Sequence, residues 1–392
     1  MEVRTCYYKI TNCYADIWIA HLLQDEIDYA YAYGGARILP FNTDNQLVLT
    51  TLNNLLIYES ALKNRLINFA IETGILHEFN KALPAGLLNN KVGAARCIIR
   101  PKNRKVKNIL RDHHATGFPE IISSVMQSVG RLLNEQKGRI KPTPDFGRFA
   151  SFADHLFKYT PHTLGISHGN GGCGTKAPYS AAGIIAVMKT LNISCTDHVT
   201  LIGANGAIGR IVLKHLLHNG FQKIIICDTA YSNGAADVII PDAACITVKQ
   251  AVPGKFTNDC LRSGKVIIAT TIGQELEQSD ISMLQPGACL LLAHSLAVSP
   301  GAGGISIMQA LKKRRVLTVP GQILTIGGAL VSRIEWFWRQ QQTKGLFDRE
   351  LAYTVVDKVA AFLTGHILNK ADAADITPFE ALLHHLPEVG HV

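Results

Sequence analysis

Three regularly spaced glycines follow a short apolar run in the middle of the chain, and this feature constrains the fold most. The run is Val-Thr-Leu-Ile at 199–202, and the glycines are Gly203, Gly206 and Gly209. Glycines between a strand and a helix permit a tight turn, close approach of a ligand to the backbone, and close helix–strand packing. The spacing is Gly-x-x-Gly-x-x-Gly, with Ala204 where the shorter Gly-x-Gly form would have its first glycine.

Apolar runs recur through the second half of the chain, alternating with helix-like segments. They are 199–202, 223–228, 266–270 and 288–293. This alternation predicts an α/β fold with a parallel, doubly wound sheet. Apolar periodicity predicts further helices over 119–133, 178–191 and 348–368.

Asp228 ends the strand expected after the glycine turn, nineteen residues beyond Gly209. A carboxylate there accepts hydrogen bonds from both ribose hydroxyls of a dinucleotide and repels a 2′-phosphate. Amides at the helix N-terminus would bind the phosphates. The sequence therefore predicts NAD rather than NADP. The expected contacts from the turn are Gly203, Asn205, Gly206, Ala207, Ile208 and Gly209. The alternative is that the glycines serve turn geometry alone.

Thr270 and Thr271 follow the apolar run that begins at Val266. The carboxyl ends of parallel strands meet at one edge of a sheet, where ligands bind. We therefore expect both threonines to lie near the cofactor. An ordinary polar loop is the alternative interpretation.

The composition is that of a folded, core-forming chain. Of 392 residues, 47% are hydrophobic and 18% are charged, and the length suggests two domains. The longest purely apolar run, 288–293, has six residues, so we expect no membrane span. The N-terminus has no apolar signal region, and the nine cysteines form no Cys-x-x-Cys pair. We therefore expect free thiols and a cytoplasmic location.

The net charge of +9 is partly local, because six basic residues lie between Arg100 and Arg111. No recognition-helix pattern, zinc spacing or interleaved aromatic residue accompanies them, which argues against nucleic acid as a partner. We interpret the run as a solvated loop or sheet edge. A docking patch for an anionic partner is the alternative.

Five further segments occur in a fixed order along the chain. They are Tyr33-Gly-Gly-Ala-Arg-Ile-Leu-Pro-Phe, Lys81-Ala-Leu-Pro-Ala-Gly-Leu, Arg139-Ile-Lys-Pro-Thr-Pro-Asp145-Phe-Gly, Leu164–Gly183 and Pro320–Leu330. Together with the glycine turn, their order and spacing resemble the leucine, phenylalanine, valine and glutamate dehydrogenase family. Among the members of this family, the chain resembles leucine or tryptophan dehydrogenase. The resemblance spans roughly residues 33–335.

The resemblance implies two α/β domains with a cleft between them. It also implies reversible oxidative deamination, in which an L-amino acid and NAD give a 2-oxo acid, ammonia and NADH. By this resemblance Lys81 binds the substrate carboxylate, Asp145 polarises groups around the attacking water or ammonia, and Ser180 contacts the nicotinamide amide. The implied substrate-binding residues are Gly34, Gly35 and Thr325.

The chain departs from the family pattern at the second lysine, the general base. At the family's spacing from Lys81 stands Gly93, and counting back from the following strand gives Arg96 or its neighbour. Arginine is a poor general base because it stays protonated. Lys91 lies two residues before Gly93. Either Lys91 supplies the catalytic base through a rearranged loop, or the base is absent.

These departures leave three functions open. In the first, the chain is a dehydrogenase whose altered substrate site accepts an imine, a keto acid condensed with a second amine, or a bulky aromatic acid of specialised metabolism. Alternatively, the chain retains bound NAD for a non-dehydrogenase reaction, or it binds NAD without catalysis. His168, Cys173 and His294 are spare candidate acids or bases, with polar loop residues as the alternative. We expect no metal site.

We expect three parts in the chain. A substrate-binding and oligomerisation domain covers 1–165, an NAD-binding domain covers 166–344, and C-terminal helices over 345–392 pack back on the first domain. The resemblance implies a homo-oligomer, a dimer or larger, that binds a small-molecule substrate. We expect no membrane partner.

Overall fold

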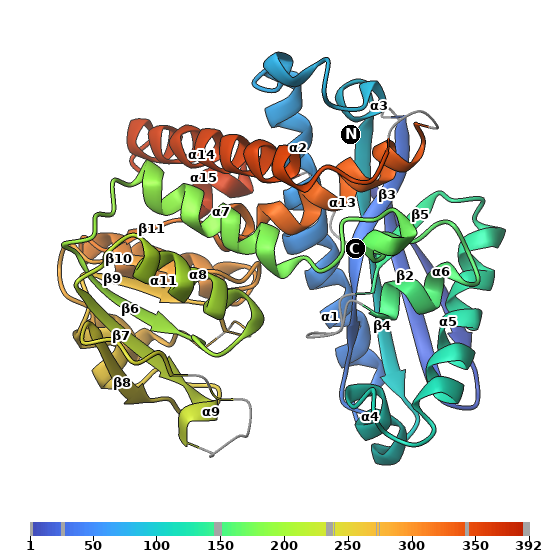
Figure 1. Cartoon of the computed structure of the whole chain (residues 1–392), viewed down its shortest axis with the longest axis horizontal. Coiled ribbons are helices and arrows are strands. Elements are labelled where there is room, and N and C mark those ends of the chain that lie inside the picture. Colours follow the sequence, from blue (N-terminus) through green and yellow to red (C-terminus); the bar gives the residue numbers. More distant parts are fainter. Residues whose placement is uncertain are drawn as a thin grey trace. The chain divides into compact units, whose positions relative to one another are not determined.

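The computed structural model describes residues 3–24, 28–144, 151–232, 238, 240–271, 273, 275–341 and 345–386. These residues form two compact units, which Figure 1 shows in colours that follow the sequence. The first unit comprises the described residues up to Lys176, Ala329–Ala352 and Leu386. The second comprises those of Ala177–Gly328 and Tyr353–His385. The expected boundaries at 165/166 and 344/345 do not coincide with these units.

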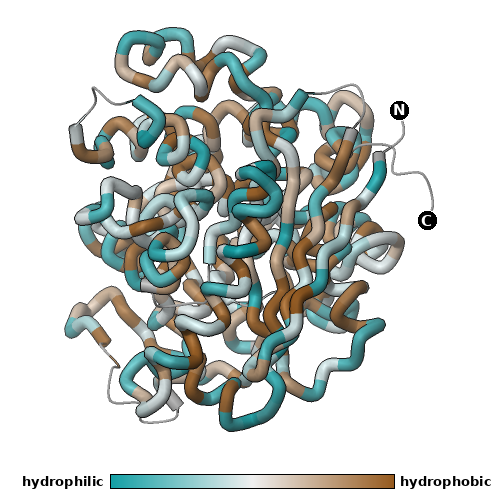
Figure 2. The backbone as a smooth tube through the Cα atoms, turned by 90° about the vertical axis from the view of Figure 1, so that its right-hand side faces the viewer, coloured by the Kyte–Doolittle hydropathy of each residue, from teal (hydrophilic) through white to brown (hydrophobic). Residues whose placement is uncertain are grey.

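In the described part of the first unit, five strands form a mixed sheet. In spatial order they are β1 (Val3–Thr11), β2 (Ala15–Gln24), β4 (Lys91–Pro101), β3 (Tyr29–Ile38) and β5 (Ile140–Thr143). β2 pairs antiparallel with β1 and β4, whereas β3 runs parallel to β4 and β5. In Figure 2 the strands of this sheet carry brown, apolar stretches, as expected for strands that pack into a core.

Helices and short helical turns make up much of the remaining described part of this unit, and several of the helices supply core residues. They are α1 (Asn45–Leu55), the π-helical turn η1 (Leu56–Ala61), α2 (Leu62–Glu72), the 3-10 turn η2 (His77–Phe79), α3 (Ala85–Asn89), α4 (Arg104–Arg111), α5 (Phe118–Glu135), α6 (Ser151–Phe157), the 3-10 turn η3 (His168–Asn170) and most of α13 (Ile326–Arg339). α5 confirms the helix predicted over 119–133. Pro119 lies in its first turn, where a missing N–H costs nothing. Ile122 and Val125 are fully buried in the core.

In the described part of the second unit, six strands form a sheet in which every pair is parallel. In spatial order they are β11 (Leu317–Thr318), β10 (Cys289–Leu292), β9 (Val266–Ala269), β6 (His198–Ile202), β7 (Lys223–Asp228) and β8 (Ile246–Gln250). All four predicted apolar runs form strands, which confirms the doubly wound parallel sheet. The strand order reverses between β6 and β9, and such a switch point is where open α/β sheets bind ligands.

The described part of the second unit also contains a set of helices and short helical turns. They are α7 (Ala177–Thr190), α8 (Ala207–His218), α9 (Thr229–Ser232), α10 (Asn258–Arg262), the 3-10 turn η4 (Gln278–Met283), α11 (Ala302–Lys313), α12 (Gly321–Leu324), α14 (Arg349–Ala373) and α15 (Pro378–Leu383). α7 and α14 confirm the helices predicted over 178–191 and 348–368. Thr377 and Glu380 form a reciprocal capping box that begins α15.

Most of α14 belongs to the second unit, whereas the sequence placed the C-terminal helices on the first domain. Tyr353 of α14 stacks on Tyr179 of α7, with ring centroids 4.8 Å apart. Among the described residues, α14 is also the one helix long and apolar enough to cross a membrane by length and composition. Core helices pass the same test, and Val355, Val359 and Leu363 of α14 are fully buried within the protein.

Lys141 of β5 is a buried lysine held between aromatic rings. Its side chain is 4% exposed, and Nζ lies 4.0 Å from the ring centroid of Trp336 and 4.9 Å from that of Tyr31. Nζ donates a hydrogen bond to the carbonyl of Gly138. Burial and, to a smaller extent, the nearby Arg339 guanidinium together lower the pKa of Lys141 to about 8. The charged form is therefore disfavoured in the folded protein relative to the unfolded chain.

This predicts a rise in stability between pH 8 and pH 10.5. The folded pKa of Lys141 lies below the unfolded value of 10.5, so in this window the unfolded state binds more protons and stability increases with pH. Lys141→Met should remove roughly 2 kcal/mol of this increase. Urea unfolding at pH 7.5 and pH 10 measures it. Lys9→Met is the control, because Lys9 lies over Trp18 at 5.1 Å but is exposed. An unchanged pH dependence in Lys141→Met would contradict the assignment.

Two residues of the basic run are neutralised within the first unit. Arg100 and Lys102 form ion pairs with Asp16, at 2.7 and 2.5 Å. Burial raises the pKa of Asp16, but hydrogen bonds from Arg100 and Lys102 outweigh it and lower the pKa to about 2. The rest of the run extends into α4, where Arg104 and Arg111 are exposed. The run is thus partly an internal ion-pair network and partly a solvated helix face.

Candidate functional site

The glycine turn of the second unit has the strand–turn–helix geometry that the sequence predicted. Gly203 directly follows β6 and has a φ of +80°, a backbone conformation that glycine adopts without strain. Its N–H donates to the carbonyl of Cys227 in β7 at 2.8 Å. Gly206 precedes α8, and its N–H donates to the Gly203 carbonyl at 3.0 Å. The turn is therefore anchored to the neighbouring strand.

Gly209 lets α8 pack directly on this turn. A Cβ atom added at Gly209 would lie 2.1 Å from the Gly203 carbonyl oxygen and 2.9 Å from the Cα of Ala204. Both neighbours are backbone atoms, so no side-chain movement relieves the clash. This is the close helix–strand packing expected of the third glycine in such a motif.

Asn205 contributes to the turn through internal bonds. Its backbone N–H donates to Oδ2 of Asp228 at 2.8 Å. Arg210 clamps its side chain, with Nη2 of Arg210 donating to Oδ1 of Asn205 at 2.7 Å. The Asn205 amide therefore orients Asp228. The first turn of α8 contains Ala207, Ile208 and Gly209, and N–H groups at such a turn have no partner within the helix and can bind an anion.

Asp228 ends β7 beside the glycine turn, as predicted. Oδ2 accepts the Asn205 N–H, and Oδ1 accepts the N–H of Ala230 at 2.9 Å. A carboxylate has about four acceptor positions, so each oxygen of Asp228 can accept one more hydrogen bond. Two backbone amides thus fix a carboxylate that can still receive two hydroxyl groups.

A hollow of about 260 Å³ opens beside these residues. We call this cavity the nucleotide hollow. It is lined by Ile202, Gly203, Gly206, Asp228, Thr229, Ala251, Val252, Pro253, Gly254, Lys255, Phe256, Thr270, Thr271 and Glu275. The structure therefore brings the two predicted threonines to the glycine turn and Asp228. Thr270 Oγ1 lies 3.1 Å from the carbonyl oxygens of Ile202 and Gly203, to which it donates. Thr271 donates a hydrogen bond to the Glu275 carboxylate. Burial raises the pKa of Glu275.

Gly34 and Gly35 of β3 are packed against β4 and η1 in the first unit. A Cβ atom at Gly34 would lie 1.6 Å from the Ala95 carbonyl oxygen. A Cβ atom at Gly35 would lie 2.9 Å from Nη1 of Arg96. Packing therefore requires glycine at position 34, where the close atom belongs to the backbone, whereas at position 35 the neighbour is the guanidinium end of the Arg96 side chain.

Arg96 is the buried cation of this region. Its side chain is 7% exposed, and Nη1 forms an ion pair of 3.3 Å with Glu59 of η1. Lys63 lies 3.9 Å from the same carboxylate. The position that the sequence related to the family's general base thus holds a permanently charged, ion-paired arginine.

The two lysines predicted to be catalytic lie at the surface of the first unit. Lys81 is exposed in the loop after η2. Lys91 begins β4 and forms a 2.7 Å ion pair with Glu72, and both side chains are about half exposed (48% and 50%). Asp145, the third predicted catalytic residue, lies outside the described residues. The first unit therefore does not bury Lys81 or Lys91 within itself.

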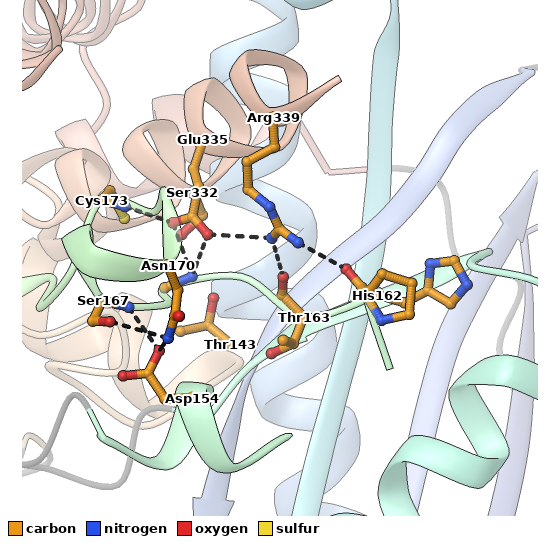
Figure 3. A network of polar contacts seen from close by, with 12 residues as sticks. Thr143, Asp154, His162, Thr163, Ser167, Asn170, Cys173, Ser332, Glu335 and Arg339 are labelled. Carbon is orange, nitrogen blue, oxygen red and sulfur yellow. Dashed lines mark hydrogen bonds and ion pairs between the residues drawn. The ribbon is translucent and has the colours of Figure 1, made fainter. Parts of the chain in front are cut away.

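A buried carboxylate that the sequence analysis missed organises the glycine-rich loop before α7 (Figure 3). Glu335 of α13 is fully buried and accepts the N–H of Gly165 at 3.0 and 2.9 Å, and that of Cys173 at 3.1 Å. It also pairs with Arg339 at 3.5 Å and Lys176 at 3.8 Å. The available signal was a Glu–Arg pair at i, i+4 spacing inside a helix that is mostly apolar.

The same network fixes the neighbouring segments. Arg339 donates to the carbonyl of Thr163 at 2.7 Å, and Asp154 accepts the N–H of Ser167 at 2.8 Å. Burial lowers the pKa of Lys176, but the Cys173 and Glu335 side chains outweigh it and the pKa is raised. Burial raises the pKa of the Cys173 thiol. Cys173 is thus a poor acid or base at neutral pH, and Lys176 stays charged.

Comparisons with known proteins agree on the architecture. No protein-family model matches the chain. L-tryptophan dehydrogenase from Nostoc punctiforme matches with a TM-score of 0.63 and 15% identity, over 97% of this chain and 93% of that one. The Leu-bound hetero-hexameric glutamate dehydrogenase from Thermus thermophilus matches with a TM-score of 0.67 and 13% identity, over 98% and 86%.

The chain has the fold of the amino-acid dehydrogenases. A separate match concerns sequence over part of the chain: 125 residues are 32% identical to glutamyl-tRNA reductase 3, chloroplastic, from Hordeum vulgare. That match covers 30% of this chain and 23% of the length of that relative.

Within this amino-acid dehydrogenase fold, Ser180 and Thr325 are both buried in the second unit. Ser180 lies in α7. Thr325 Oγ1 donates to the Gly321 carbonyl at 2.7 Å and lies 3.4 Å from Ser295 Oγ. His294 Nδ1 accepts the N–H of Leu296 at 3.0 Å, which makes His294 part of a turn. Among the described residues, no group of three or more His, Cys, Asp or Glu side chains could hold a metal ion.

Proposed function

We propose that this protein is an NAD-dependent oxidoreductase acting on an amino acid, a 2-oxo acid or a related imine. The observation that carries the proposal is the nucleotide hollow, where Asp228 and the glycine turn meet at the switch point of the parallel sheet. A Cβ atom would fill the turn at Gly209, so the cradle depends on glycine there. The dehydrogenase fold and the ordered family-like segments support the substrate class.

The residues of the second unit would divide the work of binding. Asp228 would accept hydrogen bonds from the ribose hydroxyls, and the first-turn amides of α8 would bind the pyrophosphate. Thr270 and Thr271 would lie beside the cofactor. NAD, when bound, accepts or donates the hydride. We further propose that the protein is a homo-oligomer. Support for assembly comes from a structural neighbour, the glutamate dehydrogenase from Thermus thermophilus, which is itself an oligomer, a hetero-hexamer.

An NADH-oxidation assay tests the proposal. Purified full-length protein is mixed with NADH and a panel of aliphatic and aromatic 2-oxo acids, each with and without ammonia. Ammonia-dependent oxidation supports reductive amination. Oxidation with preformed imines but not with ammonia supports an altered imine site. Failure of NADH to bind at all contradicts the proposal.

A second function is favoured by one observation. Lys81 and Lys91 are exposed, and a paired arginine stands near the family's base position. If neither Lys81 nor Lys91 serves as the base, the chain would bind NAD for a different reaction or without catalysis. NAD that co-purifies in stoichiometric amount and is never consumed would favour this second function. Turnover that Lys81→Ala abolishes while NADH binding persists would favour the first.

Asp228→Ser should change cofactor preference. The variant loses the carboxylate that accepts ribose hydroxyls and repels a 2′-phosphate, and Lys255 in the same hollow can then attract that phosphate. We expect NADH to bind about 10-fold more weakly and NADPH more tightly. Fluorescence titration with both cofactors measures the change. Asp242→Ser is the control, because Asp242 is exposed and outside the hollow. Equal weakening for both cofactors would contradict the role given to Asp228.

A further inference from the structure

Two cysteine thiols meet in the interior of the second unit. Cys227 is the next-to-last residue of β7, and Cys260 lies in α10. Their Sγ atoms are 2.6 Å apart, although 33 positions separate them along the chain. Cys227 is fully buried and Cys260 is 2% exposed. The roles of Asp228 and the glycine turn do not require this contact.

The surroundings make the two thiols chemically unequal. The hydrogen bond with Cys227 lowers the pKa of Cys260, and Thr257 Oγ1, which donates to its Sγ at 2.9 Å, acts in the same direction. Burial acts against this by raising the pKa. The same thiol–thiol bond, together with burial, raises the pKa of Cys227. Cys260 therefore carries the more thiolate character, and thiolates are the nucleophiles of sulfur chemistry.

We propose that Cys227 and Cys260 form a reversible disulfide under a peroxide. The Cys260 thiolate attacks one peroxide oxygen, so an S–O bond forms, the O–O bond breaks, and the leaving hydroxide takes up a proton as water. Cys227 Sγ then attacks the Cys260 sulfur, so the S–S bond forms and the S–O bond breaks. The second hydroxide leaves with the Cys227 proton as water. Two thiols and one hydrogen peroxide thus give one disulfide and two water molecules, and a dithiol reverses the reaction.

The bond would tether one wall of the nucleotide hollow. Residues 251–256 of that wall run from the end of β8 toward α10. β8 already pairs with β7, and in this pairing Lys249 of β8 lies opposite Cys227 of β7. A bond from Cys260 to Cys227 would therefore anchor both ends of the segment on β7. The Cys227 carbonyl also accepts the Gly203 N–H at 2.8 Å, so the tether is continuous with the glycine turn.

Peptide mapping of the unmodified full-length chain tests the bond directly. The reduced protein is treated with hydrogen peroxide, alkylated without reductant, and digested with trypsin. The tryptic peptide 224–249 contains both Cys227 and Cys245, whereas 256–262 contains Cys260. Chymotrypsin, which cleaves after Tyr231, separates the first two cysteines. A linked fragment containing Cys227 and Cys260, lost on reduction, is expected. Linkage through Cys245, or alkylation of all three thiols, would overturn the proposal.

Hydrogen exchange tests the tether without any nucleotide, so the result is independent of the proposed cofactor. Oxidation should slow deuterium uptake across 251–256 several-fold and raise the thermal midpoint of the second unit by about 5 °C. Cys260→Ser should abolish both effects, whereas Cys195→Ser, at an exposed cysteine of the same unit, should keep them. Identical uptake in oxidised and reduced wild-type protein would overturn the tether.

Discussion

Gly209→Ala is expected to abolish nucleotide binding and to destabilise the second unit by about 3 kcal/mol. The new methyl group would lie 2.1 Å from the Gly203 carbonyl oxygen, so α8 must move away from β6. That movement displaces the first-turn amides from the phosphates and the turn from Asp228. NADH titration should show at least about 100-fold weaker binding, or about 2.7 kcal/mol. Urea unfolding monitored by circular dichroism measures the stability.

Gly365→Ala is the matched control for this substitution. Gly365 lies inside α14 in the same unit, and an added Cβ meets no atom within 4 Å. The same chemical change should there stabilise the protein by about 0.5–1 kcal/mol, because alanine favours helix more than glycine. NADH binding should be unchanged. If Gly209→Ala bound NADH like the wild type, the packing argument for the turn would be wrong.

Glu335→Gln should destabilise the first unit by about 3–5 kcal/mol. The substitution keeps the shape of the side chain but removes the charge that Lys176 and Arg339 share. Both cations are largely buried, with side chains 12% and 13% exposed, so they would remain in the interior without their carboxylate. Loosening of the loop around Cys173 should follow. Urea unfolding gives the stability, and alkylation of Cys173 reports on the loop.

Glu135→Gln provides the comparison at the surface. Glu135 pairs with Arg131 at 3.9 Å with i, i+4 spacing, but their side chains are 61% and 70% exposed. Surface pairs contribute little, so this variant should lose less than about 0.5 kcal/mol. Equal losses in Glu335→Gln and Glu135→Gln would refute the central role of Glu335 in the network of Figure 3.

The fold of the second unit was predictable because its signals are local. Four apolar runs indicated the strands, and the glycine spacing indicated the turn between β6 and α8. The position of Asp228 followed, since a residue at the end of the next parallel strand lies beside that turn. The use of the Asn205 amide to hold Asp228 was not predictable, because it depends on the exact path of the turn.

The catalytic residues expected in the first unit remain a prediction, for a physical reason. Family-like segments singled out Lys81 and Lys91, but the surroundings of a lysine decide its pKa, and sequence spacing carries no information on those surroundings. Lys91 pairs with Glu72 at the surface instead. The buried cations of this unit include Arg96, Lys141 and the fully buried Arg333, and each is surrounded by segments distant in the sequence.

The sequence alone determined the parallel sheet, its glycine turn and the carboxylate at the end of the next strand. Hydrophobic periodicity and backbone geometry act over a few residues, so these features can be derived without tertiary contacts. Only the tertiary structure decided which charges are buried and which are solvated. Glu335 meets the N–H of Gly165 across 170 positions of the chain, and Cys227 meets Cys260 across 33. Such contacts arise when distant segments pack together, because a buried charge requires partners that local sequence does not supply.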